Sequence, residues 1–151
     1  MSRIRVVIFL AMILVSSVLL LACKTDGTRN LEFESHVFRN VGVGDHKHIA
    51  KFMDLKELQY YLDEHGIYKG EFYEFLTKYY TNDFFAQNYI LFLTITGSGA
   101  DSFIIEKITS NGYIHITKSS GVLTNIESWK IIIELSRITA STAFQIKLNE
   151  I

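Results

Sequence analysis

The stretch Tyr89-Ile90-Leu91-Phe92-Leu93-Thr94-Ile95-Thr96 decides the fold class, because β-branched and aromatic residues fill it and Gly97-Ser98-Gly99 ends it. Such a segment predicts a β-strand. Further segments of this character predict strands at 102–109, 113–118, 128–136 and 142–148. The pair Asn111-Gly112 predicts a tight hairpin turn between two of them, because both central residues of a type I′ turn need positive φ.

Alternation along 128–136 assigns its side chains to two faces. Trp129, Ile131, Ile133 and Leu135 share one face, and Lys130, Ile132, Glu134 and Ser136 share the other. We therefore expect Trp129 on the inner face of a sheet.

The region before these strands has the period of helices. Asp54 is the expected N-cap, Glu57 completes a capping box, and Gly66 is placed to end the helix. Its apolar stripe consists of Leu55, Leu58 and Leu62. A second helix over 71–80 places Phe72, Phe75, Leu76 and Tyr79 inward, and Asn82-Asp83 is expected to stop it.

Two early segments, 31–41 and 47–53, predict strands joined by a turn at Gly42, Gly44 and Asp45. The order of elements predicts an α+β fold, an antiparallel β meander of about five to seven strands with two helices packed on it. We expect residues 31–151 to form a single globular domain.

The N-terminal segment has the pattern of a secretory signal. Arg3 and Arg5 precede an apolar or small-residue run of sixteen residues, Val6 to Leu21, which is shorter than the roughly 18 residues of a membrane-spanning helix. Cleavage is therefore favoured over spanning. A plain secretory signal and an uncleaved anchor helix are the alternatives.

The run ends in Leu20-Leu21-Ala22-Cys23, which resembles the lipobox of bacterial lipoproteins. The resemblance implies that residues 1–22 are a signal peptide, that the chain is cut after Ala22, and that Cys23 carries lipid. Cys23 is the only cysteine in the sequence, so no disulfide is expected. Residues 23–30 would then be the lipidated N-terminus and a short tether.

Composition argues against several partners and activities. The formal charge is −1, or −3 without Arg3 and Arg5, and no basic stripe is present, so nucleic-acid binding is not expected. No local motif defines a catalytic residue, and we expect neither an enzyme nor a cofactor. His46 and His48 are weak candidates for a metal site, because alternate strand residues point to one side.

The densest feature is a run of aromatic residues between Phe72 and Tyr89. With Phe72, Phe75 and Tyr79 inward, Tyr73 and Tyr80 would lie on a neighbouring face as a contact patch. We place the possible binding surface at Tyr73, Tyr80 and the turn containing Ser98 and Asp101. Burial of the whole aromatic cluster in the core is the alternative.

Several segments together resemble a group of uncharacterised small lipoproteins of Gram-positive and related bacteria. The likeness rests on the capped helix at 54–58, Asp83-Phe84-Phe85, the strand and turn at 89–99, and Ser128-Trp129-Lys130-Ile131. The second half is remotely similar to the β domain of protease-complex inhibitor lipoproteins, although Gly97-Ser98-Gly99 replaces the Gly-Gly-Tyr signature of that domain. Neither likeness implies a catalytic residue.

These features predict a protein held by lipid on Cys23 to the extracytoplasmic face of a cell membrane. We expect a binding or inhibitory module for a protein or envelope ligand. An accessory envelope hydrolase or a metal-binding protein is the alternative.

Overall fold

The computed structural model describes residues 28–39, 48–121, 123, 125–139 and 143–150. The predicted signal peptide, Cys23, His46 and the turn at 42–45 lie outside these residues. The described chain forms strands β1 (Asn30–Leu31), β2 (Phe33–Arg39), β3 (His48–Phe52), β4 (Asn88–Ser98), β5 (Ser102–Thr109), β6 (Tyr113–Ser119), β7 (Ile126–Ser136) and β8 (Gln145–Glu150). Its α-helices are α2 (Leu55–Glu64), α3 (Glu71–Tyr79) and α4 (Asn82–Gln87), and a short 3-10 helix η1 spans Arg137–Thr139.

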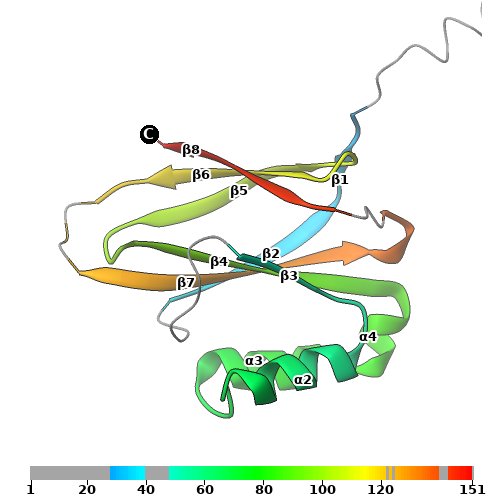
Figure 1. The fold of residues 1–151 in the computed structure, drawn as a ribbon. Helices are drawn as coiled ribbons and strands as arrows, with labels where there is room; N and C mark the ends of the chain where they lie inside the picture. The colour runs from blue at the N-terminus through cyan, green and yellow to red at the C-terminus, as the bar shows by residue number, and fades with distance from the viewer. Residues whose placement is uncertain (1–27, 40–47, 122, 124, 140–142, 151) are drawn as a thin grey trace, which may run out of the picture.

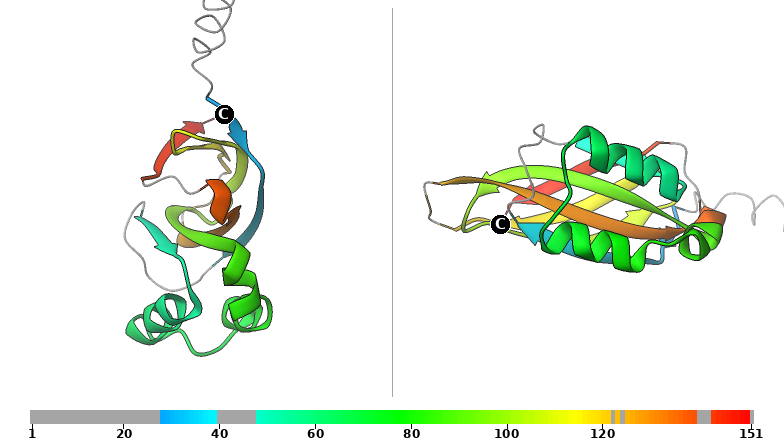
Figure 2. Two further views of the ribbon diagram at one scale, coloured as in Figure 1. Left: turned by 90° about the vertical axis from the view of Figure 1, so that its right-hand side faces the viewer. Right: turned by 90° about the horizontal axis from the view of Figure 1, so that it is seen from below.

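The strands form two sheets that stack face to face, with the α-helices on the outer face of one of them (Figures 1 and 2). One sheet has the order β1-β5-β6-β8, and the other has the order β2-β7-β4-β3. The α+β class predicted from the sequence is confirmed. Its finer arrangement differs from a simple meander, because β7 lies between β2 and β4, and β8 runs parallel to β6.

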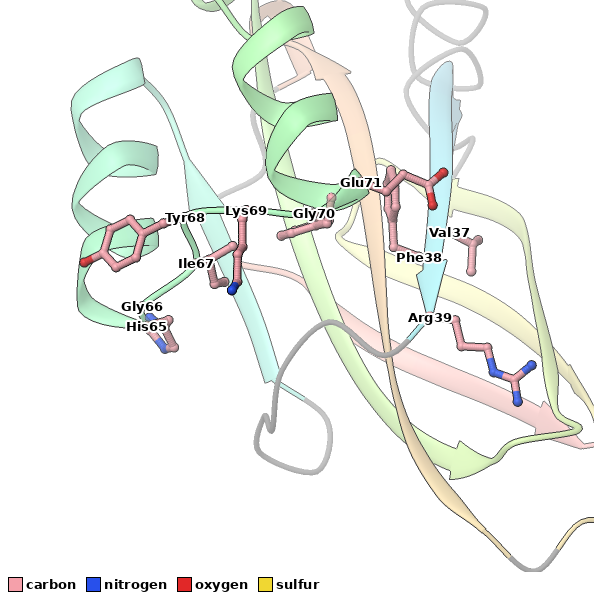
Figure 3. Close-up of a pocket in the computed structure, with 11 residues that line it drawn as sticks. Val37, Phe38, Arg39, His65, Gly66, Ile67, Tyr68, Lys69, Gly70 and Glu71 are labelled. Atoms are coloured by element: carbon pink, nitrogen blue, oxygen red, sulfur yellow. The ribbon is translucent and has the colours of Figure 1, made fainter.

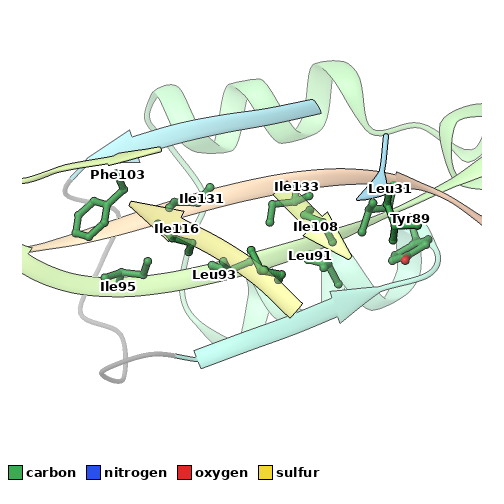
Figure 4. Packing of buried hydrophobic residues seen from close by; sticks show 12 residues of the cluster. Leu31, Tyr89, Leu91, Leu93, Ile95, Phe103, Ile108, Ile116, Ile131 and Ile133 are labelled. Carbon is green, nitrogen blue, oxygen red and sulfur yellow. The ribbon is translucent and has the colours of Figure 1, made fainter. Parts of the chain in front are cut away.

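Two hydrophobic cores hold the three layers together. The core between the sheets contains Leu91 and Leu93 from β4 and Ile131 and Ile133 from β7 (Figure 4). The other core lies between the second sheet and the helices, and Ile90, Phe92 and Ile132 supply its sheet side. Strands β4 and β7 are therefore covered on both faces, which explains the unbroken apolar runs at 89–93 in β4 and 131–133 in β7.

The first predicted helix forms with the expected ends. The Asp54 side chain accepts a hydrogen bond from the Glu57 N–H at 2.9 Å, and the Glu57 carboxylate accepts one from the Met53 N–H at 2.6 Å. Gly66 adopts φ +63°, and the Ile67 N–H donates to the Leu62 carbonyl at 2.9 Å. The Asp54 cap and the Schellman ending at Gly66 agree with the prediction, whereas the Glu57 carboxylate accepts from the N–H of Met53, one residue before the N-cap, rather than from that of Asp54 as in a standard capping box.

Other local predictions need correction. Asn82 and Asp83 do follow the end of α3, but they also begin α4, whose N-cap Thr81 accepts a hydrogen bond from the Phe84 N–H. The β5–β6 turn is tight as expected. Its hydrogen bond runs from the Gly112 N–H to the Thr109 carbonyl, so Ser110 and Asn111 are the central residues and Gly112, with φ +87°, follows them.

Candidate functional site

A hollow of about 580 Å³ forms a groove between the end of β2 and the connection from α2 to α3. Figure 3 shows Val37, Phe38 and Arg39 on one side and the segment from His65 to Glu71 on the other. Its volume lies within the usual range for ligand pockets. Two tight backbone turns, Gly66 with φ +63° and Gly70 with φ +93°, shape the segment that forms the second side.

The groove combines an aromatic base with a rim that holds two cations, Arg39 and Lys69, and one carboxylate. Phe38 packs edge-on against Phe72, with ring centroids 5.2 Å apart, and both rings belong to the helix-side core. Val37 and Tyr68 are 45% and 58% exposed, so apolar surface is accessible from solvent. Arg39, Lys69 and His65 line the groove, whereas Glu71 is the one carboxylate among its lining residues.

Arg39 is held in place by two contacts. Its guanidinium forms an ion pair with Glu127 on β7, one hydrogen bond measuring 2.8 Å, and it lies over the Trp129 ring with 5.4 Å to the centroid. The hydrogen bond with Glu127 raises the pKa of Arg39 and lowers the pKa of the Glu127 carboxyl. Within the described chain, Lys69 has no ion-pair partner, so its charge is available to a ligand.

The predicted tyrosine patch is wrong at Tyr80. Its side chain is only 1% exposed and lies in the helix-side core, whereas Tyr79, predicted to point inward, is 51% exposed. Helix α3 ends at Tyr79, and Tyr80 has extended backbone angles, so the helical spacing used for the prediction does not reach it. Tyr73 is half-buried and packs against the same core.

The predicted contact residues in the β4–β5 turn have structural contacts of their own. Asp101 is 4% exposed, accepts a hydrogen bond from the Ser98 N–H at 2.7 Å and pairs with Lys118 Nζ at 3.3 Å. Burial alone would raise the pKa of Asp101, but the hydrogen bonds from Ser98, Lys118 and Gly121 lower it below its ordinary value. The turn also joins the two sheets, because β4 and β5 belong to different sheets. Asp101 therefore stabilises this connection and is not an exposed contact residue.

The structure describes only one histidine of the predicted pair. His48 is exposed at the start of β3, and His46 lies outside the described residues. A different set could hold a metal ion: Glu34, His36 and Glu134 have one potential ligand atom each, all within 4.8 Å of one another. Sequence reasoning missed this set because Glu134 is almost one hundred positions from His36, and only the β2–β7 pairing joins them.

Comparisons with known proteins and a search for membrane-spanning helices both gave negative results. The chain matches no known family model, no curated protein sequence and no solved structure. Among the helices of the described residues, none is long and apolar enough to cross a membrane.

Proposed function

We propose that this protein is a lipid-anchored, non-enzymatic domain of the cell envelope that binds a segment of another protein in the groove between β2 and the α2–α3 connection. The lining of the groove carries the proposal. Val37 and Arg39 on β2 and Tyr68 and Lys69 on the α2–α3 connection line opposite sides of the groove, so each side has one exposed apolar residue and one cationic residue. Charge complementarity therefore favours a ligand segment with an apolar anchor residue next to an Asp or Glu.

A lipid on Cys23 would leave the groove accessible to such a ligand. Arg29 lies six positions after Cys23, and a chain of that length reaches about 20 Å at roughly 3.3 to 3.6 Å per residue. The first strand of the described chain, β1, belongs to the sheet that lies away from the helices (Figure 1). A domain anchored in this way would turn that sheet towards the membrane and leave the helical layer and the groove facing outward.

The anchor is tested by replacing Cys23 with Ser. We expect loss of fatty-acid labelling and accumulation of the unprocessed precursor, because the thiol accepts the lipid before cleavage. Unchanged labelling and membrane retention would refute the lipoprotein assignment.

The groove is tested by selecting peptides from a displayed random library on the lipid-free domain. We expect enriched peptides to share an apolar residue adjacent to Asp or Glu. Their binding should weaken at least tenfold in Tyr68→Ala and in Lys69→Glu. The first change removes the apolar contact, and the second reverses the charge that attracts the acidic residue. The matched controls are Tyr60→Ala, which removes another exposed tyrosine from α2, and Lys107→Glu, which reverses an exposed charge on β5.

Binding that is equally strong in the two groove variants and the two controls would place the interface elsewhere. Selected peptides without acidic residues would also contradict the charge argument.

A further inference from the structure

We infer that Glu34 and His36 of β2 and Glu134 of β7 form a binding site for a divalent transition-metal ion, of which Zn²⁺ is the best match. This site lies outside the groove and does not depend on the function proposed for it.

The β2–β7 pairing brings the three side chains to one face of the sheet. Glu34 lies directly opposite Glu134 in the antiparallel register, and His36 follows Glu34 by two positions. The His36 Nε2 atom lies 3.1 Å from Glu134 Oε1. All three ligand atoms lie within 4.8 Å of one another, a spread that small side-chain rotations can close around one ion with bonds of about 2.0 to 2.2 Å.

The facing carboxylates are an independent reason to expect a cation. Like charges directly opposite each other in adjacent strands destabilise a sheet, because their side chains are held within about 5 Å. No lysine or arginine of the described residues forms an ion pair with Glu34 or Glu134. A bound divalent ion would neutralise both carboxylates at once.

The surroundings leave room for the ion and hold its ligands. A hollow of about 350 Å³ opens beside the cluster and is lined by Glu34, Glu134, Asn88 and Ser136, so water can complete the coordination. The Tyr80 hydroxyl donates to Glu134 Oε1 at 2.8 Å, and the His36 ring packs on Phe75 with centroids 4.6 Å apart. Both hydrogen bonds to Glu134 fall on Oε1, and within the described chain Oε2 accepts none.

The donor set selects the kind of ion. One imidazole and two carboxylates suit Zn²⁺ and other first-row divalent ions, whereas Ca²⁺ and Mg²⁺ prefer sites made only of oxygen. Tyr80 would act as a positioning residue, because outer hydrogen bonds orient the carboxylate ligand.

The test is a calorimetric titration of the full chain in detergent with zinc chloride, in a Cys23→Ser background that removes the one thiol. We expect one saturable zinc site that Ca²⁺ and Mg²⁺ do not fill at the same concentrations. Glu34→Gln and His36→Ala should each weaken zinc binding at least tenfold. Tyr80→Phe should weaken it about tenfold.

Matched controls separate this cluster from its neighbours. Glu32→Gln changes a carboxylate that lines the same hollow but is not one of the three ligands, and the double variant His46→Ala, His48→Ala removes the histidine pair predicted from the sequence. Zinc binding should be unchanged in both. Because Glu34 is exposed, Glu34→Gln should leave the circular dichroism spectrum unchanged, so loss of zinc binding in that variant cannot be attributed to unfolding.

Absence of saturable zinc binding would overturn the inference. Binding that persists in Glu34→Gln and His36→Ala, or that is lost only in the His46, His48 double variant, would also overturn it.

Discussion

Adjacent tyrosines at the end of α3 provide the sharpest test of the structure, since one is core and the other is surface. Tyr80 is 1% exposed and Tyr79 is 51% exposed. The Tyr80 ring packs against Phe84 with centroids 4.8 Å apart and against Phe75 at 5.9 Å. Removing a buried aromatic side chain costs about 3 to 5 kcal/mol, so Tyr80→Ala should lower the free energy of unfolding by about that amount.

Two further variants separate the contribution of the Tyr80 hydroxyl from that of its ring and provide a surface comparison. Tyr80→Phe keeps the ring and removes only the hydroxyl that donates to Glu134, which should cost about 1 to 3 kcal/mol. Tyr79→Ala removes a ring that touches Phe75 at the surface, with centroids 4.7 Å apart, and should cost no more than about 1 kcal/mol.

The measurement is urea unfolding of residues 24–151, followed by circular dichroism. With a slope of about 1 to 3 kcal/mol per molar urea, Tyr80→Ala should shift the midpoint downward by at least about 1 M. Equal losses in Tyr79→Ala and Tyr80→Ala, or a larger loss in Tyr79→Ala, would refute the placement of these side chains.

Three further predictions concern stability. Gly66→Ala should cost about 1 kcal/mol of the free energy of unfolding, because Gly66 has φ +63°, a conformation that alanine disfavours. The cost comes from the backbone alone, since an added Cβ would meet no atom within 4 Å. An unchanged urea midpoint would contradict the Schellman ending of α2. Asp101 has a lowered pKa in the folded state, so its contribution is complete above the ordinary aspartate pKa of about 3.9 and is lost as pH falls through the lowered value. The stability difference between the natural chain and Asp101→Asn should therefore shrink between about pH 5 and pH 2, and a difference independent of pH would argue against the Lys118 and Ser98 contacts. Lys130 is 3% exposed and donates to the Tyr61 hydroxyl at 2.9 Å, with no carboxylate partner in the described chain. Lys130→Met should therefore be neutral or raise the free energy of unfolding by up to about 2 kcal/mol. A loss above about 1 kcal/mol would show that the charge of Lys130 stabilises the core.

Trp129 illustrates a partly successful prediction. The strand alternation correctly placed it with Ile131, Ile133 and Leu135 towards one core, where its ring meets Phe103 at 5.6 Å. The side chain is only half-buried, because it lies near the end of the sandwich beside the exposed Arg39. Its indole N–H is buried and has no hydrogen-bond partner among the described residues.

Local chemistry determined much of this protein from the sequence alone. The caps of α2 at Asp54 and Gly66, the strand character of 89–96 and the two faces of 128–136 follow from interactions within a few residues, so one segment was enough to predict them. The tertiary structure decided what covers each face. Burial of both faces of β4 and β7 requires a second sheet, and an apolar run does not reveal which distant strand will cover it. The same limit applies to the candidate metal site, because Glu34 and Glu134 meet only through the pairing of β2 with β7. Tyr80 differs from its predicted place because the chain leaves the helix one residue earlier, and packing against the sheet, rather than helical spacing, sets the direction of its side chain.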